Sequence, residues 1–337
     1  MPMLDIFGSS AFNTRALTGA INLLANKHLK LAQMGLFTTR SARHNLIAVE
    51  RKTQSLKVLP TVEWGGPPTK GGVRTRELIS LAIPHIPVED RIRAADVQGI
   101  RAFGSESELE QVQDLVNEKL IDLNDALDIT EEYMRWGCLN GSVIDGGGTT
   151  ILNLFTAMDI TQEEQDFALS NSATNVEKAV VDLKRYYEAN AKGVMVNGLH
   201  VFCSDGWWDA FKANAKVEKI YNVYANLGQV IGVDYRTRFV AWGVTFENVS
   251  GSWTNMAGTT VYQVPADEAI AIPIGPPIFE THYAPAGFME TVNTPGLPRY
   301  AKRAQDPKYD EYVDILAETN PLPFCTRPDL IVSLTKS

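Results

Sequence analysis

The spacing of apolar and polar positions predicts a mixed α+β chain with one helix much longer than the rest. The apolar residues of this helix recur at intervals of three and four and form one stripe: Leu109, Val112, Val116, Leu120, Leu123 and Leu127. Ser105 and Glu108 have the spacing of a capping box. The pattern predicts a helix over residues 105–136, about 45 Å long, that spans the molecule as a spine. Gly137 and Gly141 are expected to end it.

The first part of the chain has a different pattern. Residues 1–42 show no sustained period and predict an arm with a short helix near residues 18–32. Residues 44–50 and 55–62 have strand patterns on either side of the polar segment 51–54, which predicts a hairpin turning there.

Residues 64–72 contain too much glycine and proline for regular structure, and an extended run resumes over residues 74–83. A long β-excursion of this kind is poorly suited to burial within its own subunit. We therefore expect it to lie on a neighbouring one. The residues expected to make that contact are Trp64, Gly65, Gly66, Pro67, Pro68, Lys70, Arg74 and Arg76.

The rest of the chain alternates shorter elements. No internal repeat is present, and after residue 235 the pattern consists mostly of short strands separated by prolines. The predicted elements are a hairpin with strands 143–145 and 150–155, a helix over 176–191, a strand over 199–203, a helix over 206–219 and a terminal strand over 330–334.

Charge and composition narrow the function classes. The net charge is -9, and the densest basic stretch is the short segment 299–303, which disfavours tight binding to nucleic acid. No apolar run approaches the roughly 18 residues of a membrane span, and the N-terminus lacks the order of a secretory signal. The three cysteines are far apart, which argues against both a disulfide framework and a metal site.

Candidate chemistry is weak. Gly66 and Gly71 have the glycine spacing of a phosphate-binding loop, but the required lysine and hydroxyl do not follow. His200, Cys203 and Asp205 form the one cluster that suggests catalysis, yet His200 and Cys203 would project to opposite faces of a strand. We expect no catalytic residue, cofactor or metal.

Five segments of the chain, in this order, are distinctive: residues 83–90, 97–106, 283–286, 289–302 and 320–329. Together they resemble the lambda-like major capsid proteins of tailed phages, the phage major capsid protein E family. The resemblance runs from about Asp5 to the end of the chain and is weakest in residues 9–34, 161–174 and 248–260.

The resemblance implies the Hong Kong 97-type capsid fold. Its expected parts are an N-terminal arm over residues 1–42, an extended loop over 43–82, a peripheral domain over 83–141 and 306–337 with the spine helix at 105–136, and an axial domain over 142–305. The C-terminal strand is expected to return to the peripheral domain.

The resemblance also implies a function and partners. The chain would be a non-enzymatic subunit that self-assembles into pentamers and hexamers of an icosahedral shell. That shell would enclose double-stranded DNA, without sequence-specific binding, and expand on maturation. Partners would be a scaffolding protein, a portal and a small decoration protein, with assembly in the host cytoplasm and a final place in the virion. Lys70 is a conceivable donor for covalent cross-links between subunits, although a decoration protein is favoured over cross-links.

Two alternatives remain open. A nanocompartment shell protein of the same fold would enclose protein cargo instead of DNA. A hydrolase using Cys203 or Asp205 with His200 would form a small oligomer with a pocket.

Overall fold

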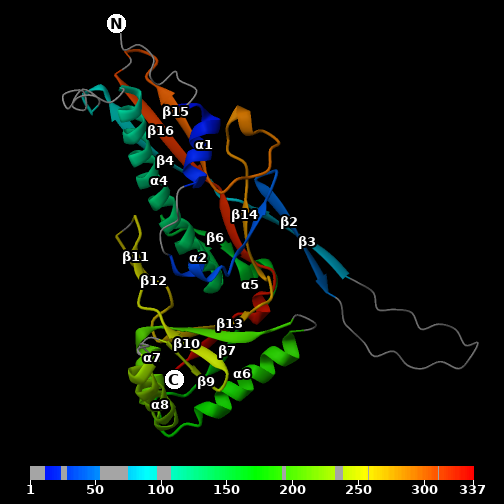
Figure 1. The fold of residues 1–337 in the computed structure, drawn as a ribbon. Coiled ribbons are helices and arrows are strands. Elements are labelled where there is room, and N and C mark those ends of the chain that lie inside the picture. Colours follow the sequence, from blue (N-terminus) through cyan, green and yellow to red (C-terminus); the bar gives the residue numbers. More distant parts are fainter. Residues whose placement is uncertain are drawn as a thin grey trace, which may run out of the picture.

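The structure of the protein is a computed structural model, and it describes residues 12–23, 29–53, 75–96, 108–191, 195–231, 238–256, 258–309 and 311–337. One long helix, α4 (Glu108–Leu139), runs down the elongated molecule (Figure 1). The other α-helices are α1 (Thr14–Leu23), α2 (Lys30–Met34), α5 (Leu154–Ala157), α6 (Val176–Asn190), α7 (Asp205–Ala213) and α8 (Ala215–Ile231).

The described strands fall into six sheets, three of which build the body of the molecule. We call these the spine sheet, made of β15 (Tyr300–Gln305), β16 (Tyr312–Thr319) and β4 (Ile86–Arg93); the bridging sheet, made of β1 (Thr38–Ser41), β14 (Phe279–Tyr283) and β17 (Pro321–Cys325); and the six-stranded sheet, made of β7 (Glu163–Asp166), β18 (Val332–Thr335), β13 (Glu268–Ile274), β8 (Gly198–Cys203), β10 (Val244–Asn248) and β9 (Arg238–Ala241). Three separate pairs are β2 (Leu46–Thr53) with β3 (Thr75–Ala82), β5 (Ser142–Ile144) with β6 (Thr150–Asn153), and β11 (Ser252–Thr254) with β12 (Thr260–Tyr262).

The antiparallel spine sheet lies along the upper part of α4, and α1 packs on the same sheet (Figure 1). The apolar stripe predicted for the long helix supplies this interface. Leu120 and Leu127 of α4 are fully buried in one cluster with Ile92 and Ile315 of the sheet and Leu17 of α1. Burial of such side chains contributes roughly 1.5–3 kcal/mol each, so the stripe fixes the sheet and the arm helix on the spine.

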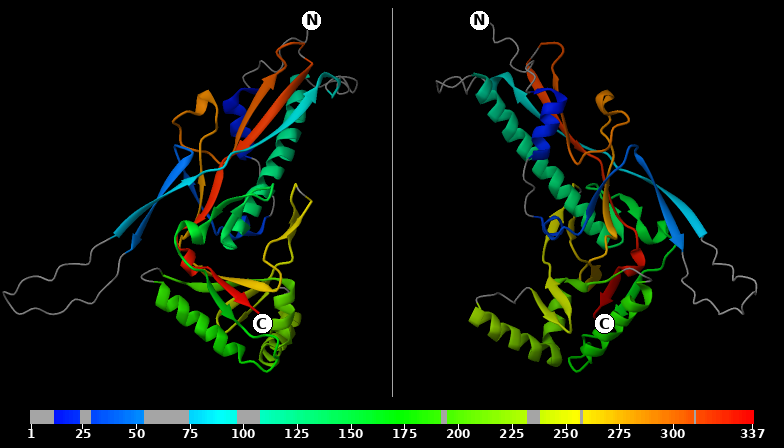
Figure 2. Two further views of the ribbon diagram at one scale, coloured as in Figure 1. Left: turned by 180° about the vertical axis from the view of Figure 1, so that it is seen from behind. Right: turned by 45° about the vertical axis from the view of Figure 1, so that its right-hand side comes forward.

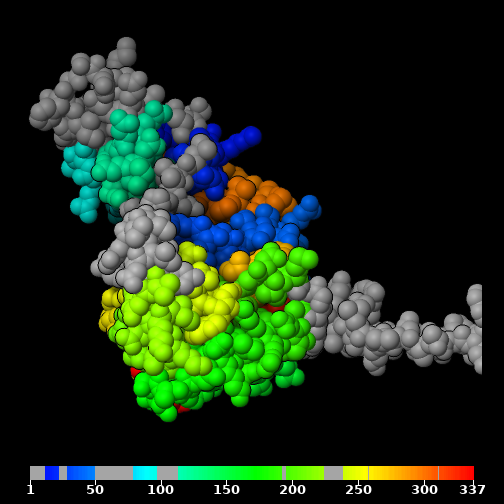
Figure 3. All heavy atoms as spheres, turned by 60° about the horizontal axis from the view of Figure 1, so that its bottom comes forward, coloured from blue at the N-terminus to red at the C-terminus, as the bar shows by residue number. Residues whose placement is uncertain are grey.

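The six-stranded sheet lies across the lower end of α4. Trp136, near the end of the helix, meets Phe202 of β8 edge-on at 5.0 Å between ring centroids. On the other face, Phe246 of β10 packs against Trp207 and Phe211 of α7. Period-2 alternation therefore gives each strand one side for the spine and one side for helices. Helices α6 and α8 form much of the molecular surface at this end (Figure 3).

The pair β2–β3 forms a long antiparallel hairpin that projects away from the body in every view (Figures 1 and 2). Its eight paired positions run from Leu46↔Ala82 at the base to Thr53↔Thr75 at the far end. Leu81 at the base is buried in the main core, and Ile47 and Ile79 pack against that core. The base of the hairpin thus belongs to the core of the subunit, and the other end of the hairpin projects beyond that core.

Two predicted elements differ from the structure. The polar segment 51–54 was expected to be a turn, but Arg51, Lys52 and Thr53 continue β2 and pair with Glu77, Arg76 and Thr75. Polar residues are compatible with a strand that leaves the core, so polarity did not mark a turn here. The expected helix over 206–219 is two helices, because Asn214 adopts an extended conformation (φ −67°, ψ 130°) between α7 and α8.

The expected end of the long helix and the arm also need correction. Gly137 lies inside α4, which continues to Leu139. The arm contains two helices, α1 and α2, on either side of residues 24–28, instead of one near 18–32.

The sheets divide the chain differently from the expected layout. Strand β18 lies in the six-stranded sheet beside β7 and β13, so the C-terminal strand does not return to the spine sheet. Strand β15, expected with the axial residues, pairs with β16 along α4. Sequential hairpin pairing accounts for β15, and the apolar pattern of a terminal strand does not specify which sheet receives it.

Other expected elements are confirmed. These are the hairpin at β5 and β6, the helix α6, the strand β8, and the extended run that forms β3.

Candidate assembly surfaces

Most of the predicted contact residues belong to the stretch of sequence that connects β2 to β3. Trp64, Gly65, Gly66, Pro67, Pro68, Lys70 and Arg74 fall outside the described residues. Arg76 belongs to β3 and pairs with Lys52 in register. The structure therefore describes the two strands that lead to this segment, and the contacts of the segment stay a prediction.

A buried cluster of charges anchors the lower half of α4. Arg299, just before β15, is almost fully buried. Its guanidinium donates to Asp128 Oδ1 (2.5 Å), Glu131 Oε2 (2.8 Å) and Asn124 Oδ1 (3.2 Å), all on α4. Paired, hydrogen-bonded groups are the condition under which charges can be buried at all. Arg299 thus fixes the segment that enters the spine sheet against one face of the spine helix.

The cluster continues to the bridging sheet and the arm. Glu131 also accepts hydrogen bonds from Arg135 on α4 and from the hydroxyl of Tyr283 on β14. Burial alone would raise the pKa of Glu131, but the charges of Arg135 and Arg299 outweigh it and hold that pKa below its usual value. Glu132 accepts from the backbone N–H of Leu31 in α2 at 2.7 Å, and its burial raises its pKa. One stretch of α4 therefore holds the arm, the bridging sheet and the spine sheet together.

Sequence reasoning missed this cluster. The only signal was a second row of polar residues at helical spacing beside the apolar stripe, Asn124, Asp128, Glu131 and Arg135. Such a row is usually a solvated face of a helix. Nothing in the pattern identifies Arg299, 164 positions after Arg135, as its partner.

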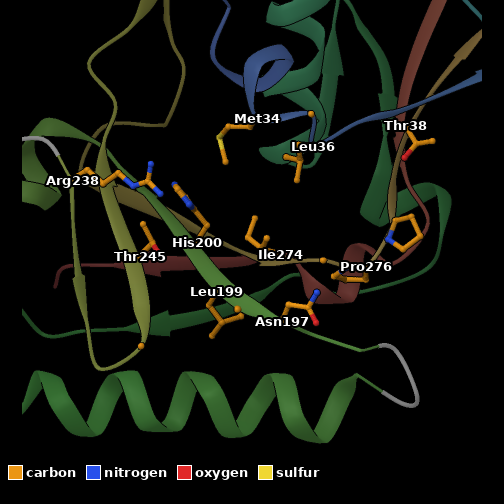
Figure 4. A pocket seen from close by; sticks show the side chains of 15 residues that line it. Met34, Leu36, Thr38, Asn197, Leu199, His200, Arg238, Thr245, Ile274 and Pro276 are labelled. Atoms are coloured by element: carbon orange, nitrogen blue, oxygen red, sulfur yellow. The ribbon is translucent and has the colours of Figure 1, made fainter.

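A cavity of about 640 Å³ lies between the arm and the six-stranded sheet (Figure 4). Met34 and Leu36 line one side, and His200 and Arg238 point toward each other on the other side. The described residues that line it include no carboxylate and no thiol. His200 is the described lining residue that could act as a general base, and no thiol or carboxylate lines the cavity beside it as a nucleophile.

An ion-pair chain beside the cavity connects the arm to the six-stranded sheet. Glu247 of β10 pairs with Lys30 of α2 at 2.5 Å and with His200 Nε2 at 3.0 Å. Burial would raise the pKa of Glu247, but the hydrogen bonds from His200 and Lys30 lower it to about 2. Glu247 is thus ionised over the whole physiological range and holds α2 on the sheet.

The cluster of His200, Cys203 and Asp205 has structural contacts. His200 bonds to Glu247, and its ring lies 4.5 Å from that of Phe202. Cys203 is completely buried, and burial raises the pKa of its thiol well above the usual value, which disfavours the reactive thiolate. Asp205 Oδ1 accepts from Asn248 and Ser250. The three residues therefore have the contacts of ordinary core and turn residues.

Two further findings concern the described part of the chain alone. It contains no group of three or more metal-binding side chains that could hold an ion. None of its helices is both long enough and apolar enough to cross a bilayer.

The family model described as phage major capsid protein E matches residues 13–336, nearly the whole chain. The chain belongs to the phage major capsid protein E family. Among curated proteins it is 28% identical to the major capsid protein of Pseudomonas phage KPP10, over 95% of this chain and 96% of that one. It is 24% identical to the major capsid protein of Salmonella phage Felix O1, over 98% of both chains.

One solved structure shares the fold. A crystal structure described as a capsid protein of an Escherichia coli CFT073 prophage superposes with a TM-score of 0.59 at 14% identity, covering 98% of this chain and all of that one. The chain therefore has the α+β Hong Kong 97-type capsid fold. As a member of the phage major capsid protein E family, it is a major capsid protein of the tailed-phage type, a structural subunit and not an enzyme.

Proposed function

We propose that copies of this chain form pentamers and hexamers that close into an icosahedral shell around double-stranded DNA, and that the shell expands on maturation. The observation that carries this proposal is the β2–β3 hairpin. It leaves the body carrying 21 further residues, 54–74, between its two strands. A hairpin that points away from the core of its own subunit can stabilise only a contact with another molecule.

Closed shells need heterologous contacts that close on themselves. Stable contacts bury roughly 1,200–2,000 Å². The hairpin, the arm and the surface helices α6 and α8 (Figure 3) would supply several such surfaces on one subunit. Many contacts per subunit make a shell stable even when each one is weak.

The parts of the subunit receive the following roles in this proposal. Residues 1–42 act as the arm and 43–82 as the extended loop. The spine helix with the spine sheet forms the peripheral domain, and the six-stranded sheet with α6, α7 and α8 forms most of the axial domain around the pentamer and hexamer axes. This differs from the layout expected from sequence in two places. We assign residues 300–305 to the peripheral domain because β15 belongs to the spine sheet, and residues 332–335 to the axial domain because β18 belongs to the six-stranded sheet.

The negative charge of the chain suits a container. A wall with net charge -9 per subunit would not hold DNA that has to be pumped in. Partners in assembly would be a scaffolding protein, a portal and a small decoration protein, with assembly in the host cytoplasm. We favour stabilisation by a decoration protein over covalent cross-links through Lys70. A boiled, reduced gel of purified shells should then show single subunits, and a ladder of multimers would contradict this choice.

The test is negative-stain electron microscopy of the purified protein beside a variant lacking residues 65–72. We expect shells, tubes or capsomers from the full chain, and a folded subunit without normal shells from the deletion. Normal particles from the deletion would remove the hairpin from the proposal. A full chain that stays a monomer or dimer, even with a co-expressed scaffolding protein, would contradict assembly itself. Protein cargo in place of DNA inside particles from infected cells would favour the nanocompartment alternative.

A further inference from the structure

One long face of α4 is not covered by the rest of the subunit. Between Gln113 and Asn140 its exposed side chains are Asp114, Asn117, Glu118, Ile121, Asp122, Ala126 and Ile129. These include three carboxylates and no lysine or arginine, and Lys119 at the edge of the face is paired with Asp90 at 2.8 Å. Ile121 and Ile129 keep 45% and 44% of their surface exposed, although β-branched apolar side chains are normally buried. The face is therefore both acidic and apolar.

This face continues into a groove beside the β11–β12 hairpin. The groove has a volume of about 430 Å³ and is lined by Ile129, Thr130 and Tyr133 of α4, by Gly146 and by residues 252–256. Tyr133 meets Trp253 edge-on at 5.6 Å between ring centroids, which forms the floor. Met256, at the end of β11, is 94% exposed at the rim. The ribbon diagrams show the β11–β12 hairpin beside the lower end of α4 (Figures 1 and 2).

Acidic groups also border the groove. Asp122 lies seven residues before Ile129, two helical turns away on the same face. Asp145 lies close enough to Tyr133 that its charge, after burial, helps raise the pKa of the Tyr133 hydroxyl. From Asp114 to Tyr133 the acidic and apolar track is about 28 Å long at 1.5 Å per residue. Such a track matches about five turns of another helix, in the manner of a helix bound in a groove.

We propose that this track binds a basic amphipathic helix of a separate protein. The apolar side of that helix would lie on Ile121, Ile129 and Met256. Its lysines or arginines would lie opposite Glu118, Asp122 and Asp145. The charge of the track selects the partner, because an acidic or neutral helix would leave the carboxylates unpaired at the contact.

A second copy of this chain does not fit the track as well. Helix α1 carries one basic residue, and α6 and α8 mix lysine with glutamate, so none of the three presents an uninterrupted basic side. Among the described helices none of these three matches the track, so we assign it to a separate protein and keep a second copy as an outcome of the test. The proposal rests on the proposed function only in that such a partner would act during assembly.

The test uses a fluorescent 18-residue leucine–lysine peptide with helical amphipathic spacing as the probe. A peptide of the same composition in scrambled order controls for charge alone. Binding is followed by anisotropy with unassembled subunits isolated by sedimentation, so that binding and shell formation are scored separately. The variants are Asp122→Lys and Met256→Asp, both at exposed positions, with Glu164→Lys on the exposed strand β7 as the matched charge control.

We expect the amphipathic peptide to bind the wild type at least ten times more tightly than the scrambled one. Asp122→Lys and Met256→Asp should each weaken that binding about tenfold or more, and Glu164→Lys should leave it unchanged. Equal binding of the two peptides, or equal effects of all three variants, would overturn the proposal. So would a loss of shells in Asp122→Lys without a change in peptide binding, because that result would assign the track to a second copy. Failure of the wild type to form shells would instead count against the proposed function.

Discussion

The buried charges on α4 are not fully balanced. Three carboxylates, those of Asp128, Glu131 and Glu132, face two guanidinium groups, those of Arg135 and Arg299. Glu132 is the group left over, because its Oε2 lies 4.0 Å from Arg135 and makes no hydrogen bond among the described residues. Burial raises the pKa of Glu132, and the hydrogen bond from Leu31 and the charge of Arg135 offset this only in part. The remaining four groups depend on one another, so loss of one leaves an unpaired charge in the interior.

Arg299→Ala should therefore destabilise the subunit by about 3–5 kcal/mol, because Asp128 and Glu131 would stay buried without their partner. The control is Arg185→Ala. Arg185 pairs with Asp182 on the exposed side of α6, where a salt bridge contributes less than about 1 kcal/mol. Urea unfolding of unassembled subunits measures both. A similar decrease in the free energy of unfolding in the two variants would show that the buried cluster does not stabilise the subunit.

At the scale of elements, two helix glycines, Gly137 of α4 and Gly19 of α1, differ in how much room a side chain would have. A Cβ on Gly137 of α4 would lie 2.7 Å from the carbonyl oxygen of Ser142, which belongs to the backbone of β5. A Cβ on Gly19 of α1 would meet nothing within 4 Å. Gly137 thus allows β5 to approach the spine helix closely, although its residue type predicted the end of that helix.

Gly137→Ala should destabilise the subunit by roughly 1–3 kcal/mol, because β5 has to move despite the better helix propensity of alanine. Gly19→Ala should stabilise it by about 0.5–1 kcal/mol, since only the propensity changes. Thermal unfolding of the two variants compares them directly. A gain of stability in Gly137→Ala would contradict the close approach.

Elements with a strong local pattern could be predicted from sequence, and their partners could not. The stripe from Leu109 to Leu127 predicted α4 because helical spacing is a local property. The partner of β2 is β3, 22 positions further along the chain, and the nearer candidate 55–62 was chosen wrongly because hairpins usually close over short turns. The break at Asn214 has no glycine or proline to mark it. Assembly contacts depend on a second molecule, so the residues 64–76 named for them stay a prediction.

At the scale of the whole molecule, the ion-pair chain from Lys30 to Glu247 and His200 couples regions that are 217 residues apart. Lys30 belongs to helix α2 of the arm, and Glu247 belongs to the six-stranded sheet. These ion pairs therefore determine how firmly the arm is held on the lower part of the subunit. Their strength should depend on pH through Glu247.

Glu247 has a pKa of about 2 in the folded protein against an ordinary value of 4.5. A lowered carboxyl pKa gives stability that is fully present above about pH 5 and is lost as the pH falls toward 2. Between these limits the wild type should lose roughly 2–3 kcal/mol more than Glu247→Gln, which cannot ionise. Chemical unfolding at a series of pH values measures the difference. Parallel pH profiles would show that the low pKa does not contribute to stability.

The order in which the chain visits its sheets has a consequence for inheritance. The chain passes from the spine helix to the six-stranded sheet, returns through β14 to β15 and β16, and comes back through β17 to finish in β18. Neither end of the molecule is encoded by one uninterrupted stretch of gene. A single recombination between two phage genomes would therefore join mismatched strands within one sheet. Genetic exchange should conserve this gene as a unit, with crossovers tolerated at its borders and selected against inside it.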